Sequence, residues 1–187
     1  MFDVRCERVQ DLHAHALIHS TFESTSVFDI VRNEGKLELV ERALAAPYRK
    51  DYDEIENPLA WPHEFDTSKW VLVSAFSGST RMGGAIGAID TPGTDMLEGR
   101  YDLAVVWDLR VAAEARRRSV ATSLLQVLVD WARESGCREL KVETQNTNVP
   151  ACRFYAAIGF KLSEANFGAY PRLPHEVQLI WRKRIDG

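Results

Sequence analysis

The sequence predicts an α/β fold: one domain with a mixed sheet, mostly antiparallel but with one parallel pair of strands, and helices on its flanks. The first indication is size, because 187 residues that are 45% hydrophobic suit one core and leave no room for a second domain of typical size. The second is a pair of apolar runs, 70–76 and 83–89, separated by a short turn as in a hairpin. The third is residues 104–160, which read as strand, basic loop, helix, strand, helix. Strands joined through a helix run parallel, and a ligand crevice is expected where a sheet changes from hairpins to such a pair.

The N-terminal residues give weaker signals. Residues 2–8 are expected to form a strand and residues 9–22 a helix that carries His13, His15 and His19. The last two histidines are four residues apart, but the carboxylate of a metalloprotease helix is missing between them. We therefore interpret the three histidines as surface or partly packed residues and predict no metal site.

The next segments leave two structures open. Residues 28–31 and 36–44 can pair around the turn signal Asn33-Glu34-Gly35, although the second segment also has helical spacing. Residues 47–58 and 61–66 are acidic, aromatic and expected to be irregular. They form either a lid or wall whose carboxylates face a cationic acceptor, or a packed and solvated connection.

The central segment gives the strongest signals. Residues 104–111 predict a strand, and apolar residues recur at helical spacing from Val120 to Trp131. Gly136 is expected to end this helix in the left-handed conformation. The arginines at 116–118 precede the helix start, where unpaired N–H groups and the macrodipole favour phosphates; the alternative is a solvated charge run.

A second strand and helix follow. Residues 139–144 predict the strand, Asn148 is a candidate N-cap with Pro150 in the first turn, and Gly159 ends the helix. Another strand comes next, and residues 177–181 predict the last one.

These segments resemble the GNAT acetyltransferase superfamily, whose loop pattern Q/R-x-x-G-x-G/A falls on Arg116, Arg117, Arg118, Ser119, Val120 and Ala121. The later asparagine and the "FY..xGF" helix of that superfamily match Asn148, Phe154-Tyr155 and Gly159-Phe160. The stretches WDLRV, LKVETQN-x-NVPACRFY and AYPRLPHEVQLIW are similar to its streptothricin acetyltransferase branch. The resemblance covers the C-terminal two-thirds well and the N-terminal third loosely, in PYRKDYD and NPLAWPHEFDTSKW.

The resemblance implies one GNAT-type domain over residues 1–187, with acceptor-side loops in 1–100 and an acetyl-CoA-binding part in 101–187. It implies direct acetyl transfer to a primary amine of a small cationic acceptor, with a streptothricin-type antibiotic as the first candidate. Acetyl-CoA is then the cofactor, without a metal. The residues expected to hold it are Leu109, Arg110, Val111, Arg116, Arg117, Arg118, Ser119, Val120, Ala121, Thr122, Asn148, Ala151 and Tyr155.

The chemistry of such a transfer sets the remaining expectations. An alkyl amine with a pKa of about 10.4 must lose a proton before it attacks, so a base or a lowered pKa is needed. Asp108 and Glu143 are the candidate bases, although a water chain needs neither. In the family the carbonyl is held by a main-chain N–H of the central strand and the acid is a tyrosine that matches Tyr155, which could otherwise be a core aromatic.

Further residues are assigned with less support. The acceptor pocket is expected to include Trp107, Asp51, Asp53 and Tyr170. Ser119 departs from the family pattern, which has glycine there, so acetyl-CoA binding is expected to weaken if that position requires glycine-like angles.

Composition limits the partners. The net charge of -4 argues against nucleic acid and suits a cationic substrate. The three cysteines lack metal-like spacing, which predicts reduced thiols. With no leader and no long apolar run, a cytoplasmic protein away from membranes is expected. Its oligomeric state is left open as monomer or homodimer. The alternatives are an acetyltransferase for another amine (a protein N-terminus, a polyamine or an aminoglycoside) and a non-catalytic acyl-CoA sensor.

Overall fold

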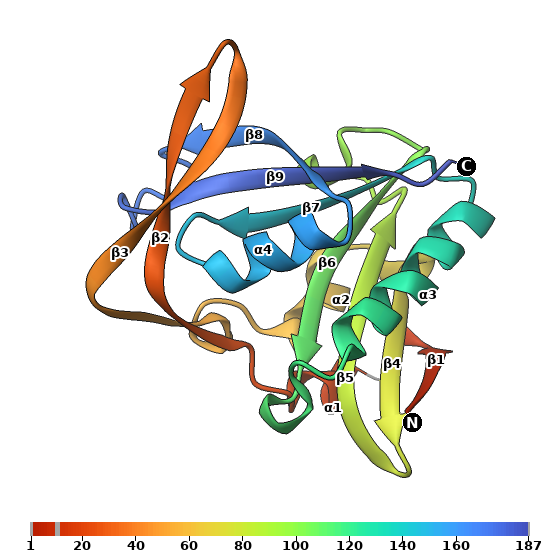
Figure 1. Cartoon of the computed structure of the whole chain (residues 1–187). Helices are drawn as coiled ribbons and strands as arrows, with labels where there is room; N and C mark the ends of the chain where they lie inside the picture. The colour runs from red at the N-terminus through yellow and green to blue at the C-terminus, as the bar shows by residue number, and fades with distance from the viewer. Residues whose placement is uncertain (1, 10–11, 187) are drawn as a thin grey trace. The chain divides into compact units, whose positions relative to one another are not determined.

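The computed structural model describes residues 2–9 and 12–186 and divides into two compact units (Figure 1). The first unit comprises residues 1–20, 52–141 and 184–187, and the second comprises residues 21–51 and 142–183. Each unit is described by itself.

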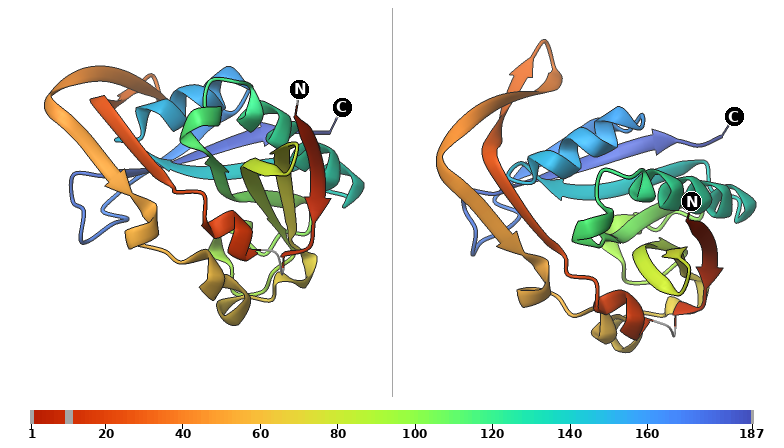
Figure 2. Two further views of the ribbon diagram at one scale, coloured as in Figure 1. Left: turned by 90° about the horizontal axis from the view of Figure 1, so that it is seen from below. Right: turned by 60° about the horizontal axis from the view of Figure 1, so that its bottom comes forward.

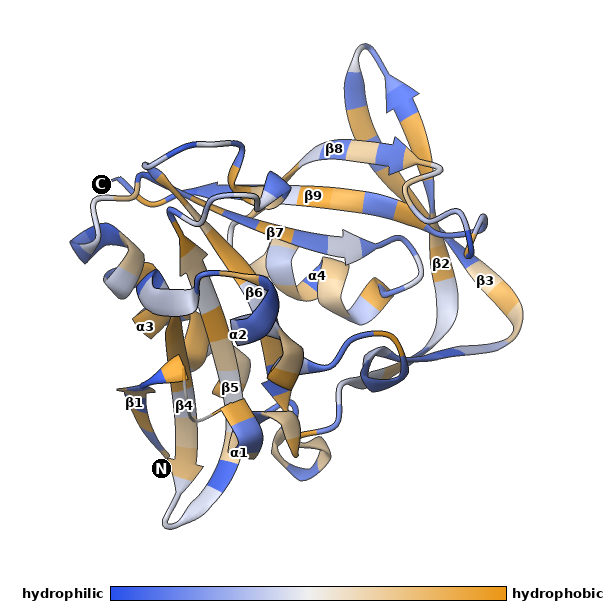
Figure 3. Ribbon diagram, turned by 180° about the vertical axis from the view of Figure 1, so that it is seen from behind, coloured by the Kyte–Doolittle hydropathy of each residue, from blue (hydrophilic) through white to orange (hydrophobic). Residues whose placement is uncertain are grey.

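The first unit is built on an antiparallel meander. Its strands are β1 (Asp3–Glu7), β4 (Val71–Ser77), β5 (Thr80–Ile89) and β6 (Leu103–Val111). Strand β4 pairs with β1 and β5, and β5 pairs with β6, all antiparallel. The middle strands are buried along almost their whole length, and Figure 3 shows them as mostly hydrophobic. This explains why the runs 70–76 and 83–89 carry apolar residues on both faces.

Helix α3 (Val120–Glu134) packs on this meander, mainly against β5 (Figure 1). Val120, Leu124 and Leu128 are buried, as their helical spacing predicts. The helix ends in a Schellman motif: the N–H of Gly136 donates to the carbonyl of Arg133 at 2.9 Å, and Gly136 has φ 85°. The prediction that glycine ends this helix is confirmed.

Short helical turns fill the connections of the first unit. They are α1 (Leu12–Ala16), η2 (Tyr52–Glu54), η3 (Pro58–Ala60), α2 (Trp61–Glu64), η4 (Thr67–Lys69), η5 (Asp95–Leu97) and η6 (Ala113–Ala115). The helix predicted over residues 9–22 was too long: residues 10–11 lie outside the described part, and Thr21 already begins a strand. Pairing with a partner strand overrides the helical spacing there.

The second unit contains a long hairpin of β2 (Thr21–Asn33) and β3 (Lys36–Asp51), the orange ribbon of Figure 2. Its turn places Glu34 at φ 48° and Gly35 at φ 82°, the pair of positive angles that a type I′ hairpin turn needs. Residues 36–44 are therefore strand and not helix. The expectation that residues 47–58 are irregular was wrong for 47–51, because Thr21–Ser24 pairs with Tyr48–Asp51 and extends β3.

The rest of the second unit consists of α4 (Val149–Ala157), β8 (Lys161–Phe167), β9 (Val177–Arg184) and most of β7 (Glu139–Gln145). Asn148 caps α4 through its side chain, which accepts from the N–H of Ala151 at 3.1 Å, and Pro150 lies in the first turn. Gly159 follows the helix at φ 90°. Both ends of this helix are as predicted.

The order of the seven-stranded sheet is β1-β4-β5-β6-β7-β9-β8, and β7 contributes residues to both units. The chain reaches β7 from its neighbour β6 through α3, which makes this the parallel pair of a sheet that is otherwise mainly antiparallel. The predicted α/β fold with a mixed sheet is confirmed. No helix in the described part of the chain combines the length and apolar character needed to cross a bilayer.

Candidate active site

Strand β6 carries a β-bulge where it pairs with its antiparallel neighbour β5. Ile86 pairs with Asp108 and Gly87 pairs with Val106, so Trp107 is the extra residue without a partner on β5. A bulge interrupts the ladder and turns neighbouring side chains to new directions, and it is common next to active sites. The bulge therefore marks this part of β6 as a candidate for the site.

Trp107 itself belongs to an aromatic cluster. Its ring centroid lies 4.8 Å from that of Trp70, 5.0 Å from Phe65 and 6.3 Å from Trp61. These contacts give Trp107 a packing role in the first unit, beside the acceptor contact that the sequence suggested. Phe65 and Trp107 pack against a buried cluster that includes Trp61 and Trp70.

Asp108 is the centre of a buried polar network. Its Oδ2 lies 2.9 Å from Nε2 of His15 and accepts from Nε of Arg110 at 2.6 Å. Burial by itself would raise the pKa of the Asp108 carboxyl, but the hydrogen bonds from His15 and Arg110 outweigh it and hold the pKa below its ordinary value of 3.8. Asp108 therefore stays an anion, which suits binding of an ammonium group better than uptake of its proton.

Arg110 extends this network to the loop after β3. Its Nη1 donates to Oδ1 of Asp53 at 2.6 Å and to the carbonyl of Ile18 at 3.1 Å, and the side chain is 3% exposed. Asp53 also accepts from the N–H of Ser20 at 3.1 Å. The Asp53 charge is thus compensated within the protein, and the Arg110 side chain is directed into the interior.

Glu56 is a carboxylate that the sequence did not single out. Its Oε1 accepts from the indole N–H of Trp61 at 2.5 Å. Loss of water around the Glu56 carboxylate raises its pKa; the hydrogen bond from Trp61 opposes this, and the charge of Asp108 raises it further. Two carboxyls of one unit thus have pKa values displaced in opposite directions, a pattern typical of sites that transfer protons. No local motif marks Glu56, because only the fold brings it near Asp108.

The start of α3 combines an uncapped helix with left-handed residues. Arg117 has φ 60° and Ser119 has φ 61° and ψ 11°, and no side chain caps the first turn. The first turn of a helix has N–H groups without intrahelical acceptors, and these attract anions. The arginines at 116–118 are exposed beside it. Ser119 adopts the glycine-like angles that its departure from the family pattern put in question, and these residues fit a phosphate-bearing cofactor.

In the second unit, Tyr155 is buried and 5% exposed, with its ring centroid 5.2 Å from Phe154 and 5.3 Å from Phe160. Asn148 uses its side-chain oxygen for the cap of α4. Tyr155 therefore packs as a core aromatic, one of the two roles left open for it, and only its hydroxyl can take part in chemistry.

Glu143 lies in a network of its own. Its carboxylate accepts from the hydroxyl of Tyr170 and from Nε2 of Gln178, the latter at 2.6 Å. Gln145 donates to the same tyrosine oxygen at 2.9 Å. Two of the residues predicted for the site, Glu143 and Tyr170, are thus in direct contact.

A second buried carboxylate of this unit, Glu176, was not predicted. It is 1% exposed and accepts from Tyr48 at 2.7 Å, Lys50 at 2.5 Å and Thr147 at 3.1 Å. These bonds attach the end of β3 to the loops before α4 and β9. Asp51 is partly buried at the end of β3.

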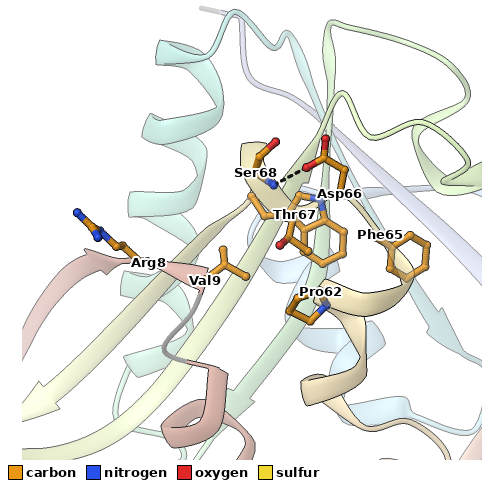
Figure 4. Close-up of a pocket in the computed structure, with 8 residues that line it drawn as sticks. Arg8, Val9, Pro62, Phe65, Asp66, Thr67 and Ser68 are labelled. Carbon is orange, nitrogen blue, oxygen red and sulfur yellow. Dashed lines mark hydrogen bonds between the residues drawn. The ribbon is translucent and has the colours of Figure 1, made fainter.

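The described residues hold no cluster of three or more histidines, cysteines or acidic residues that could bind a metal. A groove of about 540 Å³ opens in the first unit beside the aromatic cluster (Figure 4). It is lined by Arg8, Val9, Pro62, Phe65, Asp66, Thr67, Ser68 and Trp70. Asp66 caps η4 there by accepting from the N–H of Ser68 at 3.0 Å, and Arg8 points away from the other side chains. None of the residues predicted for the site lines this groove.

Three of the predicted groups are therefore brought together within a unit: Asp108 with Arg110 and Asp53, the run 116–122 at the start of α3, and Glu143 with Tyr170. The bulged strand, its parallel neighbour and the helix start between them form the arrangement in which a phosphate-bearing ligand is expected to bind. Comparison with known proteins identifies the family. The chain matches the acetyltransferase (GNAT) family over residues 37–160 and belongs to it, so it is an N-acetyltransferase.

Individual relatives and solved structures show what the chain is similar to within this family. A streptothricin acetyltransferase of Escherichia coli is 30% identical over 162 residues, covering 83% of this chain and 80% of that protein. Streptothricin acetyltransferase A of Bacillus subtilis (strain 168) is 34% identical over 80 residues, 42% of this chain and 46% of that protein. A protein from Bacillus anthracis str. Ames, solved in complex with acetyl coenzyme A, has a TM-score of 0.80 at 21% identity and covers 98% of this chain and 99% of its own. The last comparison shows the shared fold.

Proposed function

We propose that this protein transfers the acetyl group of acetyl-CoA to a primary amine of a small cationic acceptor, with a streptothricin-type antibiotic as the substrate. The observation that carries the proposal is the bulged strand β6 with Asp108 beside it, followed by a helix start with an open first turn. The Escherichia coli relative, a streptothricin acetyltransferase that matches over 83% of this chain, supports the choice of acceptor.

The cofactor supplies an acetyl group activated as a thioester. The N–H groups at the start of α3, with Arg116–Arg118 beside them, bind its pyrophosphate, and the main chain of Leu109–Val111 donates to the acetyl oxygen. Asn148 and Ala151 at the start of α4 are further cofactor contacts. Ser119 fits this site with φ 61°, because its backbone already has the angles that a glycine would adopt.

The chain's acidic residues act on the acceptor. The Asp108 anion binds the ammonium group, and Glu56, whose pKa is raised, is better suited to take its proton. Glu143, Tyr170, Asp51 and Asp53 are the other acceptor-side residues. The hydroxyl of Tyr155 carries the proton that the departing thiolate takes up.

In this proposal the whole chain, 1–187, acts as one acetyltransferase domain, with acceptor-side loops before residue 101 and the acetyl-CoA part after it. It works in the cytoplasm as a monomer or homodimer and requires no metal. Its net charge of -4 suits a cationic substrate.

The test is mass spectrometry after the protein is mixed with acetyl-CoA and streptothricin. One added acetyl group is expected, and Tyr155→Phe should lower kcat by about a hundredfold because general acid catalysis contributes about 10²–10⁴-fold. If streptothricin keeps its mass while a control acetyltransferase modifies it, the substrate is wrong. Turnover of a polyamine, an aminoglycoside or a peptide N-terminus would then identify another amine, whereas binding of acetyl-CoA without turnover of any amine would indicate a sensor.

A further inference from the structure

His15 is a fully buried histidine that the predicted chemistry does not use. It lies on the short helix α1, its side chain is 0% exposed, and Nε2 is 2.9 Å from Oδ2 of Asp108. Its other ring nitrogen, Nδ1, is buried and has no hydrogen-bond partner among the residues that the structure describes. Buried polar atoms are normally paired, so an unpaired one requires an explanation.

Gly84 supplies the explanation. A β-carbon at this position of β5 would lie 2.4 Å from Nδ1 and 3.0 Å from Cε1 of His15, so the imidazole lies directly on the glycine backbone. A proton on Nδ1 would therefore be buried without an acceptor, which is costly. The ring proton is therefore on Nε2, which donates a hydrogen bond to the Asp108 carboxylate.

The donors to Asp108 leave one of its oxygens available. Within the described part of the chain, His15 Nε2 and Arg110 Nε both end on Oδ2, and the Asp108 side chain is 14% exposed. Arg110 is itself held by Asp53 and by the carbonyl of Ile18. The rotamer of Asp108 is thus determined from two elements, and Oδ1 is the oxygen that a ligand can reach.

We propose that His15 is a positioning residue, clamped by Gly84, that orients the Asp108 carboxylate so that Oδ1 receives the ammonium group of the acceptor. This inference rests on the proposed amine acetylation. A preorganised acceptor oxygen costs no reorganisation when the substrate binds, so loss of His15 acts on the amine and not on acetyl-CoA.

The first experiment compares His15→Leu with His15→Gln, since the glutamine side chain keeps an N–H donor at similar reach. His15→Leu should raise KM for the amine about tenfold or more, because a hydrogen bond to a charged group contributes about 1.5–3 kcal/mol. His15→Gln should restore most of the loss, and KM for acetyl-CoA should stay unchanged in both variants. A rise in both KM values, or equal effects of the two variants, would overturn the positioning role.

The pH profile separates positioning from stability. The charged or titratable groups that act on Asp108 are His15, Arg110 and Glu56. With the His15 donor removed, the pKa of Asp108 rises, so the acid limb of kcat/KM for the amine should move to higher pH in His15→Leu and return in His15→Gln. A purely structural histidine would lower Tm and leave the acid limb in place.

Two measurements need no substrate. Nitrogen-15 NMR should find the His15 proton on Nε2, and protonated Nδ1 would contradict the inference. In a double-mutant cycle, Gly84→Ala should lower Tm strongly in the wild type but weakly beside His15→Ala, where the clash is absent; additive losses would disprove the clamp. If streptothricin and all other amines fail as substrates while both results hold, the proposed function fails and the His15–Gly84–Asp108 geometry stands.

Discussion

At the scale of single residues, two residues of the loop before α3 that are not glycine have left-handed backbone angles. They are Arg117 at φ 60° and Ser119 at φ 61°. Left-handed backbone costs an L-residue about 1–2 kcal/mol, whereas glycine adopts it freely. The strained residues lie next to the proposed pyrophosphate-binding site, where a rigid and open turn helps to bind phosphate.

Ser119→Gly should therefore stabilise the fold by about 0.5–1 kcal/mol after the larger chain entropy of unfolded glycine is subtracted. Urea unfolding measures this, and Ser119→Ala, which keeps the β-carbon, is the control that should show no gain. Titration calorimetry should find acetyl-CoA affinity equal or higher in Ser119→Gly. A loss of stability would mean that the serine side chain contributes more than its backbone angles cost.

Asp108 gives a prediction on pH. Its pKa is below 3.8 in the folded protein, so the unfolded chain takes up its proton first as pH falls. The stability contributed by Asp108 is complete above pH 3.8 and is lost as the pH drops toward its lowered folded value. Asp108→Asn should cost about 2–4 kcal/mol at pH 7, since it weakens a buried charge pair, and less at pH 3. Equal losses at the two pH values, measured by urea unfolding, would contradict this.

At the scale of elements, the long hairpin of β2 and β3 is attached to the second unit through Asn146. The main-chain N–H of Asn146 donates to the carbonyl of Val177 at 3.1 Å, and its carbonyl accepts from the N–H of Phe28 at 3.0 Å. The side chain repeats both connections, with Nδ2 donating to the Phe28 carbonyl at 3.1 Å and Oδ1 accepting from the Val177 N–H at 2.8 Å. One buried residue thus joins β2 to β9 with four hydrogen bonds.

Asn146→Ala should leave two buried main-chain groups unpaired and cost about 2–6 kcal/mol, at about 1–3 kcal/mol for each group. Asn146→Asp is the matched variant, because it keeps the acceptor for Val177 but replaces the donor to Phe28 with a carboxylate oxygen that repels the Phe28 carbonyl. Hydrogen exchange should show lost protection at Val177 in the alanine variant and less loss in the aspartate variant. Unchanged exchange at Val177 would refute the side-chain contribution.

At the scale of the whole molecule, the residues assigned to acetyl-CoA are distributed over both units: the start of α3 belongs to the first, and Asn148, Ala151 and Tyr155 belong to the second. Strand β7 belongs to both. A ligand that binds the folded protein and not the unfolded chain stabilises the fold by mass action.

Acetyl-CoA at about a hundred times its Kd should therefore add about 2.7 kcal/mol to the free energy of unfolding and raise Tm. Differential scanning calorimetry measures the shift, and Arg117→Glu should reduce it by reversing a charge beside the phosphates. Arg32→Glu, the same charge reversal on the exposed hairpin of the second unit, is the control and should keep the full shift. An unchanged Tm at saturating acetyl-CoA, or an equal shift in Arg117→Glu, would contradict cofactor binding at the start of α3.

Local patterns predicted much of this fold. The ends of α3 and α4 follow from Gly136, Asn148 and Gly159, because caps and left-handed glycines depend on neighbours within a few residues. The buried strands β4 to β7 follow from apolar runs for the same reason. The loop pattern at 116–121 also lies within one short segment, which is why a family resemblance could be recognised there.

Tertiary structure alone decided how the site is built. The sequence shows His15 as one of three histidines on a supposed helix, and nothing near it in the chain indicates burial against Gly84 or a bond to Asp108, 93 residues away. The same holds for Glu56, Glu176 and the contact of Glu143 with Tyr170. Pairings of charges and hydrogen bonds between distant segments depend on which strands lie side by side. The sequence by itself therefore determined the ends of α3 and α4, the buried strands and the family. The fold determined the long hairpin and which carboxylates are bound or buried.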